Sequence, residues 1–315
     1  MNLITKYFKQ KKDTNYADAE GCYNPTPILK KPQAFFKHTA VKYTIKQLNK
    51  GKSLITFPSN ITTPYPENNT VYATYRQPQE RDQHKNKGII IMLHGWKIAS
   101  QKFYTLFMRR FLKEGYGVIF LELPYHLHRT PQKSYSGEYF ITANLQRTVE
   151  AYHQAVLDVR CLIDFCIKET KNVALWGTSL GAITAALTVP FDPRIKGIIS
   201  IVGGGNIAGI CWTGISTTQV KRDCVQHNIT FETVQNYWRL IDPVTYTTHS
   251  VRKKMLMINA EKDEYIAREF TLQLWEKCGK PRIVWLPTGH VSFVLYYNKV
   301  MRECLGFLEK RFTPP

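Results

Sequence analysis

The chain has 315 residues, of which 43% are hydrophobic, and its 43 Lys and Arg against 24 Asp and Glu give a formal net charge of +19. This composition excludes wholesale disorder, and the length allows one large domain with a single core. No apolar run reaches the ~18 residues that a membrane-spanning helix needs, and the first residues are too polar for the core of a signal peptide.

The N-terminal segment, residues 1–87, is basic and predicts little regular structure before two strands. Residues 1–35 are polar, and three prolines interrupt regular structure there. Residues 40–49 fit either a short helix or an edge strand. Residues 53–57 and 70–75 predict two strands joined by a proline-rich loop, and we expect these strands to be antiparallel and to lead into the sheet.

From residue 88 onward, predicted strands and helices alternate along the chain. Such alternation is typical of a mostly parallel, doubly wound α/β sheet, here of about eight strands. The predicted order is strand 88–94, helix 100–114, strand 117–123, loop 124–138, helix 139–169, strand 173–178, helix 180–188, strand 195–202, strand 253–259, helix 264–277, strand 281–286 and helix 292–311.

Residues 203–250 interrupt this alternation. They open on three consecutive glycines and carry aromatic residues that follow no strand or long-helix period. We interpret the segment as a helical cap insertion over a pocket, which leaves residues 88–202 and 251–315 as the core. Trp212 and Trp238 are candidates for the wall of that pocket, although aromatic residues of a cap more often pack within the cap itself.

The residues around Ser179 form the most informative motif. Residues 173–181 read Val-Ala-Leu-Trp-Gly-Thr-Ser-Leu-Gly, an apolar strand that enters a G-x-S-x-G pentapeptide. A nucleophilic serine needs such a sharp strand-to-helix turn, and Gly177 and Gly181 leave space beside it. Because a helix begins directly after the serine, we expect the backbone N–H of Leu180 to point at a developing oxyanion.

An acid and a histidine follow the serine in the order that this arrangement uses. Asp263 ends a polar turn after an apolar strand, and His290 lies on a Gly-His loop after the next strand. In open parallel sheets the carboxyl ends of the strands carry the ligand crevice, so we expect the three side chains to meet there. Glu261 and Asp242 are alternatives to Asp263 as the residue that orients His290.

A second donor for an oxyanion is expected from an earlier strand-to-helix loop. The strand at 88–94 ends in His94-Gly95-Trp96. Gly95 allows this loop to bend so that the backbone N–H of Trp96 faces Ser179. The imidazole of His94 is expected to brace the loop by hydrogen bonding, and it is also a candidate for contact with the substrate.

These motifs together resemble the α/β-hydrolase superfamily of serine esterases, lipases and peptidases. The resemblance spans about 200 residues and rests on H-G-W at 94–96, G-T-S-L-G at 177–181, A-E-K-D-E-Y-I at 260–266 and P-T-G-H at 287–290. The chain is also similar to a bacterial subset of the superfamily with uncharacterised substrates, through L-P-Y-H at 123–126 and S-G-E-Y-F at 136–140.

The resemblance implies an α/β-hydrolase fold and a serine hydrolase without a cofactor. Ser179 would be the nucleophile, His290 the general base and then acid, and Asp263 the carboxylate that orients His290. The substrate would be a small acyl compound. A carboxylic ester is favoured over a thioester or an amide. The alternatives are a peptidase and a catalytically silent hydrolase fold that binds a ligand, since fold alone does not decide function.

The loop after the strand at 117–123 carries further candidates. His126 and Arg129 lie at the same sheet edge as the three residues above, and Arg129 could hold a substrate carboxylate or phosphate by bidentate contacts, or else pair with Glu138. His94, His126 and His128 are potential zinc ligands. Because no carboxylate or cysteine apart from Glu122 and Glu138 has a spacing that completes the site, we expect no metal.

The seven scattered cysteines and the unusual net charge indicate which compartment and which partners to expect. An odd number of cysteines without a C-x-x-C motif favours free thiols in the cytoplasm. The basic N-terminal segment could attract an anionic membrane surface, and residues 1–12 place apolar residues at 3, 4, 7 and 8, on one helix face, beside four lysines. Nucleic acid is not expected, because no binding motif is present and the aromatic residues are not grouped with the basic ones.

Overall fold

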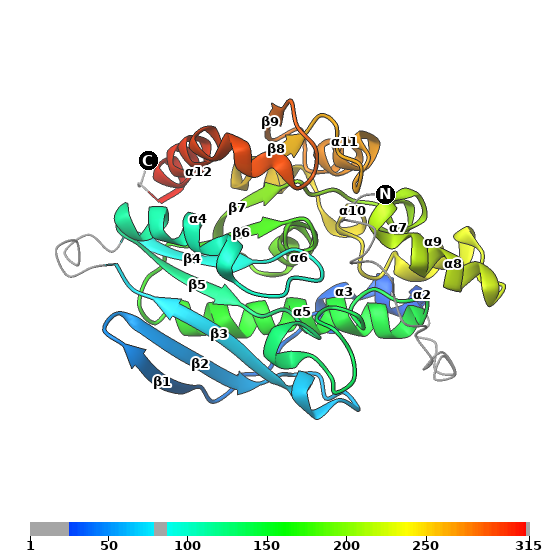
Figure 1. Cartoon of the computed structure of the whole chain (residues 1–315), viewed down its shortest axis with the longest axis horizontal. Helices are drawn as coiled ribbons and strands as arrows, with labels where there is room; N and C mark the ends of the chain where they lie inside the picture. Colours follow the sequence, from blue (N-terminus) through cyan, green and yellow to red (C-terminus); the bar gives the residue numbers. More distant parts are fainter. Residues whose placement is uncertain (1–24, 79–86, 313–315) are drawn as a thin grey trace.

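The part of the chain that the computed structural model describes, residues 25–78 and 87–312, is built on one nine-stranded sheet (Figure 1). The strand order is β1-β2-β3-β5-β4-β6-β7-β8-β9. The strands are β1 (Thr44–Asn49), β2 (Lys52–Pro58), β3 (Thr70–Arg76), β4 (Gly88–Leu93), β5 (Tyr116–Leu121), β6 (Val173–Thr178), β7 (Ile195–Ile201), β8 (Met255–Ala260) and β9 (Arg282–Leu286). The apolar helix face predicted for residues 1–12, with its neighbouring lysines, lies outside the described residues.

The sheet is antiparallel at one edge and parallel through the rest. Strands β1, β2 and β3 pair antiparallel with one another, and β3 pairs antiparallel with β5. Every pair from β5 through β4 and β6 to β9 is parallel. The predicted parallel α/β sheet is therefore confirmed, with nine strands where the sequence predicted about eight. The additional strand is β1, an edge strand whose residues are all exposed.

Helices cover both faces of the sheet because the side chains of its central strands alternate between two apolar cores. In β4, Ile89 and Ile91 enter a core shared with α5 (Leu145–Cys166), α6 (Leu180–Thr188) and α11 (Arg268–Lys277). Ile90 and Met92 face the opposite way, into a core shared with α4 (Lys102–Lys113) and α12 (Tyr297–Phe312). No helix of the described residues is long and apolar enough to span a membrane.

The boundaries of several elements differ from those predicted. Residues before the sheet are not wholly irregular, because α2 (Pro25–Lys30) and α3 (Pro32–Phe35) place Ile28, Leu29 and Phe35 against the core. Helix α5 begins at Leu145 instead of residue 139, since the Asn144 side chain accepts a hydrogen bond from the Arg147 N–H and caps the helix there.

Residues 203–250 contain a group of short helices between β7 and β8. Helix α7 contacts α8 and α9, and α9 also contacts α5. Figure 1 shows these three helices at one end of the molecule, beyond the carboxyl ends of the central strands. The helices are α7 (Ile207–Thr213), α8 (Thr218–Gln226), α9 (Phe231–Trp238) and α10 (Pro243–Tyr246), with the 3₁₀ helix η6 (Ile215–Thr217) before α8.

The remaining short elements are 3₁₀ helices in the loops. Two of them lie next to the residues predicted for the site, one after β5 and one before α12. The elements are η2 (Pro66–Asn69), η4 (Leu127–Arg129), η5 (Val189–Phe191), η7 (His249–Lys254) and η8 (Ser292–Tyr296).

Candidate active site

Ser179 lies on a tight turn between β6 and α6. Its φ is +50°, a left-handed conformation that few residues other than glycine adopt. The turn is possible because glycines surround it: a Cβ at Gly177 would lie 2.3 Å from the Gly181 carbonyl oxygen, and one at Gly181 would lie 2.1 Å from the Leu93 carbonyl oxygen. Any side chain at 177 or 181 would force the strand, the helix and β4 apart.

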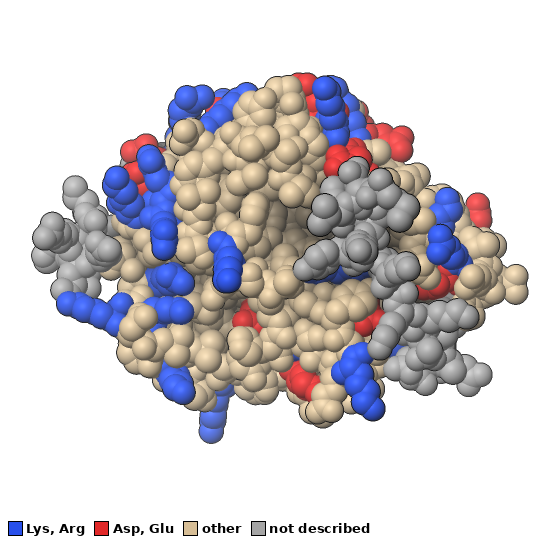
Figure 2. Space-filling view, in the orientation of Figure 1, with Lys and Arg blue, Asp and Glu red and all other residues tan. Residues whose placement is uncertain are grey.

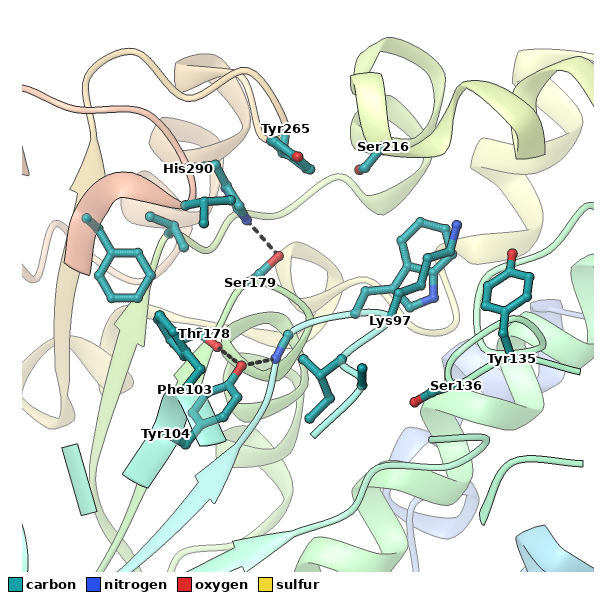
Figure 3. A pocket seen from close by; sticks show the side chains of 17 residues that line it. Lys97, Phe103, Tyr104, Tyr135, Ser136, Thr178, Ser179, Ser216, Tyr265 and His290 are labelled. Carbon is teal, nitrogen blue, oxygen red and sulfur yellow. Dashed lines mark hydrogen bonds between the residues drawn. The ribbon is translucent and has the colours of Figure 1, made fainter. Parts of the chain in front are cut away.

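The structure brings Asp263 and His290 to this serine. The Nε2 atom of His290 lies 2.9 Å from the Ser179 Oγ, and its Nδ1 atom lies 2.9 and 2.8 Å from the two Asp263 carboxylate oxygens. A carboxylate only accepts hydrogen bonds, so Nδ1 carries the proton and Nε2 accepts from the serine hydroxyl. Figure 3 shows the serine and the imidazole facing each other at the edge of a cavity.

Asp263 is held by the turn that follows β8. Its Oδ1 accepts hydrogen bonds from the backbone N–H groups of Tyr265 (2.9 Å) and Ile266 (2.8 Å). These bonds order residues 261–267 as a turn, which is why α11 begins at Arg268 and not at residue 264 as predicted. The side chains of His290 and Asp263 are only 8% and 4% exposed, so little water weakens the interaction between them.

Neither alternative acid contacts the histidine. The Asp242 carboxylate accepts from the backbone N–H groups of Asn206, Ile207 and Val244, and so caps α10. Glu261 is exposed, and its backbone N–H donates to the Leu286 carbonyl. Among the described residues, Asp263 is therefore the carboxylate that bonds the His290 ring.

Tyr265 is a further part of the site that the sequence did not single out. Its ring stacks on the imidazole of His290, with 4.7 Å between ring centroids and 21° between the planes. Burial, with Glu264 and Asp263 nearby, raises the pKa of Tyr265. The stack restrains the rotation of the imidazole. A tyrosine two residues after an acid carries no pattern that would have revealed this contact.

A cavity of about 620 Å³ opens beside Ser179. Most of its lining is apolar or aromatic, with a few hydroxyl groups and one lysine. The lining residues are Gly95, Trp96, Lys97, Ile98, Ala99, Phe103, Tyr104, Tyr135, Ser136, Thr178, Ser179, Val202, Ser216, Tyr265, His290, Val291 and Phe293. A cavity of this size suits a small organic ligand.

The loop after β4 approaches the serine from the other side. The Gly95 N–H donates to the Tyr104 hydroxyl (2.7 Å), and that hydroxyl lies 3.0 Å from the Thr178 Oγ1. Trp96 is anchored by its indole N–H, which donates to the Gly137 carbonyl (2.7 Å). A smaller cavity of about 40 Å³ is lined by Trp96, Ser179 and Leu180, the serine and the two predicted oxyanion donors, together with residues of the 203–250 segment.

His94 and His126 support this loop, as the sequence predicted for His94, and neither lines a cavity at Ser179 as the prediction of substrate contact required. Both are fully buried. The Nε2 of His94 accepts from the Leu123 N–H (3.0 Å), and the Nε2 of His126 accepts from the Lys97 N–H (3.1 Å). Burial lowers the pKa of His94 to about 4 and that of His126 well below its ordinary value. Both imidazoles are therefore neutral, with Nδ1–H donating to a backbone carbonyl.

Arg129 also lies away from the cavity, and its prediction as a substrate anchor was wrong. It is fully buried and pairs with Asp158 on α5 (2.9 Å), not with Glu138. Its other N–H groups donate to the carbonyls of Glu122 and Asn68. Burial raises the pKa of Asp158, and the Arg129 charge opposes that rise. The pair joins the loop after β5 to the long helix.

Replacement of Arg129 by Met is expected to lower the free energy of unfolding by about 3–5 kcal/mol, because the Asp158 carboxylate would stay buried without its counter-charge. Urea denaturation of the two proteins measures the change. The matched control is Arg110→Met, which removes a partly exposed i,i+4 pair with Glu114 and should cost less than about 1 kcal/mol. Equal effects of the two substitutions would contradict the prediction.

The two tryptophans proposed for an acyl pocket do not line either cavity at Ser179. Trp238 is fully buried, and its indole N–H donates to the Leu145 carbonyl (3.3 Å). Trp212 packs against Phe231, with ring centroids 5.6 Å apart. Both rings thus serve packing between helices. The 203–250 segment reaches the larger cavity through Ser216 instead, which belongs to η6.

The described residues contain no group of three or more His, Cys, Asp or Glu side chains that could hold a metal ion. The candidate zinc ligands are engaged elsewhere. His94 and His126 bond backbone groups as described above, and the Nδ1 of His128 lies 2.8 Å from a Glu122 carboxylate oxygen. At Ser179 the structure places a hydroxyl, an imidazole and a carboxylate in series.

Sequence comparisons give distant relatives. No family model matches the chain. It is 25% identical over 116 residues, 37% of its length, to the whole of the uncharacterized protein YdjC of Bacillus subtilis (strain 168). It is also 25% identical over 237 residues to an uncharacterized protein of Mycobacterium tuberculosis (strain H37Rv), an alignment that covers 73% of the chain and 54% of the relative. The chain thus spans about half the length of that relative.

Structural comparisons show the α/β-hydrolase fold. An acetyl xylan esterase from Paenibacillus sp. R4 superposes with a TM-score of 0.64 at 14% identity, covering 99% of this chain and 100% of that one. Acetyl xylan esterase 1 from Thermoanaerobacterium sp. gives 0.63 at 14% identity, with 90% and 94% covered. Acylaminoacyl peptidase from Pyrococcus horikoshii gives 0.60 at 14% identity, covering 89% of this chain and 43% of that one.

Proposed function

We propose that this protein is a serine hydrolase that cleaves a carboxylic ester through an acyl-enzyme. The observation that carries the proposal is the continuous hydrogen-bonded series from Ser179 through His290 to Asp263, at the edge of a mostly apolar cavity. Nucleophile, base and orienting acid within hydrogen-bond reach of one another are the signature of covalent acyl transfer.

In the first half of the reaction, the Ser179 Oγ attacks the ester carbonyl carbon while the His290 Nε2 takes the hydroxyl proton. The tetrahedral intermediate collapses when the bond to the alcohol oxygen breaks, and His290 gives its proton to that oxygen. In the second half, His290 deprotonates a water molecule that attacks the acyl-enzyme carbonyl. The bond to the serine then breaks, and His290 returns the proton to Ser179.

The negative charge on the carbonyl oxygen needs donors during both halves. We propose the backbone N–H groups of Leu180 and Trp96 for this role. Both residues line the small cavity beside Ser179, and Leu180 is the first residue of α6, so its N–H has no earlier carbonyl in the helix to bond. The Tyr104 hydroxyl holds Gly95 and so keeps the Trp96 backbone close to the serine.

An ester is favoured over an amide by the known activities of structural neighbours, two of which are acetyl xylan esterases. A peptidase is the second candidate, because acylaminoacyl peptidase superposes over most of the chain. We further propose that residues 203–250 cover the cavity as a cap, because Ser216 of this segment lines it.

The test combines an active-site probe with matched substrates. The purified protein is expected to react with a fluorophosphonate, with the modification on Ser179 by peptide mass spectrometry. It is also expected to cleave at least one member of a p-nitrophenyl ester series of increasing acyl length faster than the p-nitroanilide with the same acyl group. Faster cleavage of the anilides would favour the peptidase. Absence of labelling and of turnover would leave a silent fold that binds a ligand.

A further inference from the structure

Two cavities of very different size meet at Ser179. The larger, of about 620 Å³, and the smaller, of about 40 Å³, are both lined by Trp96, Ser179, Ser216 and Tyr265. The smaller cavity is therefore a recess beside the serine that shares part of its wall with the larger space. An ester whose carbonyl carbon lies at the Ser179 Oγ has two substituents, an acyl chain and an alcohol, to place in the two spaces.

The position of His290 decides which part of an ester each space holds. His290 lines the larger cavity, and it is not among the described residues that line the recess. In the first half of the reaction its Nε2 must give a proton to the alcohol oxygen, so the alcohol part has to lie on the side of the imidazole. Leu180, the proposed oxyanion donor, lines the recess. The acyl chain, on the side away from His290, therefore points into the recess.

The recess is closed by buried side chains from α5, α6, α7 and the loops beside them. These residues are Ile141, Tyr152, Leu180, Ile183, Ile207, Ile210, Cys211, Thr217 and Ile266. Because one water molecule needs about 10–15 Å³ of cavity volume, a recess of about 40 Å³ holds a group of roughly two to four non-hydrogen atoms. Such a space accepts a short acyl chain and stops a long one at the buried wall.

The recess also carries no charge. None of the described residues that line it is Asp, Glu, Lys, Arg or His, and burial raises the pKa of Tyr152 and of Cys211, so both stay neutral near pH 7. A charged acyl group would lose its hydration there without a counter-charge, which is unfavourable. Figure 2 shows that the middle of the visible face is hollowed and mostly uncharged, with lysines and arginines mainly toward its edges. These walls favour a neutral acyl group.

We propose that the site selects esters of a short, neutral acyl group, acetyl or propionyl, with a larger alcohol. The proposal rests on the serine hydrolase activity proposed above. The acyl group fills the recess, and the alcohol part lies in the larger cavity, where Phe103 and Phe293 form part of the wall. Ile183 on α6 and Ile210 on α7 are then specificity-determining residues, because they bound the recess.

The competing interpretation reverses the two parts and places a long acyl chain in the larger cavity. Ile183→Ala and Ile210→Ala each enlarge the recess and separate the two interpretations. The matched control is Ile163→Ala, because Ile163 is buried in the same apolar core, on α5, and lines neither cavity. Phe103→Ala widens the larger cavity and leaves the recess unchanged.

The experiment measures kcat/KM for two series of esters. The first varies the acyl group on p-nitrophenol, from acetate and propionate to butyrate and hexanoate. The second keeps the acetyl group and enlarges the alcohol, from phenyl acetate to 2-naphthyl acetate. The parent is expected to cleave the acetate or the propionate about tenfold or more faster than the hexanoate, because an overfilled pocket costs at least that much. It should cleave the two aryl acetates at similar rates.

The variants are expected to change this profile selectively. Ile183→Ala and Ile210→Ala should raise the ratio of hexanoate to acetate cleavage by about tenfold or more, since each makes room for further methylene groups. Ile163→Ala and Phe103→Ala should keep the ratio of the parent. Circular dichroism shows which variants fold. One folded recess variant is enough for the comparison, and the acyl profile of the parent decides if neither folds.

Four results would overturn the inference. The parent could cleave the hexanoate as fast as the acetate, the folded recess variants could leave the ratio unchanged, Phe103→Ala could raise it, or Ile163→Ala could raise it as much as they do. Any of these with some ester still cleaved and Ser179 still labelled by a fluorophosphonate would leave the proposed function standing. Failure of the parent to cleave any ester or to be labelled would remove both proposals.

Discussion

Ser179→Ala is expected to abolish ester hydrolysis, with a loss of about 10⁶-fold in kcat, the cost typical of removing a nucleophile of this kind. Alanine cannot form an acyl-enzyme, and His290 would then face a methyl group in place of the hydroxyl at 2.9 Å. The fold should be retained, because the Ser179 hydroxyl makes no other hydrogen bond within the described part of the chain. Steady-state kinetics on the best ester of the series and a thermal denaturation curve measure both effects.

The control for this prediction is Ser250→Ala. Ser250 is exposed in the 3₁₀ helix η7, where its hydroxyl bonds Thr248, so its loss should leave kinetics and labelling unchanged. If the purified Ser179→Ala protein kept its activity within tenfold of the parent, Ser179 would be removed from the mechanism.

Asp263→Asn is expected to lower kcat by about 10⁴-fold with little loss of structure. The asparagine oxygen can still accept the N–H groups of Tyr265 and Ile266, so the turn after β8 should persist. Its amide nitrogen would face the His290 Nδ1 as a donor, and the imidazole would then carry its proton on Nε2. In that tautomer the ring cannot accept the Ser179 proton.

The matched substitution is Glu261→Gln, which neutralises another carboxylate of the same turn. Glu261 is exposed and makes no contact with the His290 ring in the structure, so this variant should keep kcat within about twofold. A large loss in Glu261→Gln together with a small loss in Asp263→Asn would transfer the orienting role to Glu261. Kinetics on both variants with one ester, and circular dichroism for the fold, decide between them.

The α/β-hydrolase fold and the residues that meet at Ser179 could be predicted from the sequence because their signals are local. Apolar runs that alternate with amphipathic stretches indicate which segments are strands and which are helices. The G-x-S-x-G motif indicates a tight turn, because only glycine permits the close backbone contacts at 177 and 181. The order of Ser179, Asp263 and His290 then implied a meeting point, because parallel strands bring their carboxyl ends to one edge of the sheet.

Partners across the fold could not be predicted, because many pairings satisfy the same sequence. The carboxylate of Glu138 is nine residues from Arg129 in the sequence. Arg129 nevertheless pairs with Asp158 on α5, which is 29 residues further along the chain. Trp212 and Trp238 carried no sign of whether they pack or line a pocket. Each of these outcomes depends on how separate elements dock and on which polar groups they bury together.

The amino-acid sequence by itself determined the parallel sheet, the turn that presents Ser179 and the candidates for its partners, since each follows from local spacing along one strand or turn. Only the tertiary structure decided that Tyr265 stacks on His290, that His126 supports the loop after β4, and that Lys97 lies opposite Phe103 across the cavity. These contacts join segments far apart in the chain, and the burial that selects them exists only once those segments are packed.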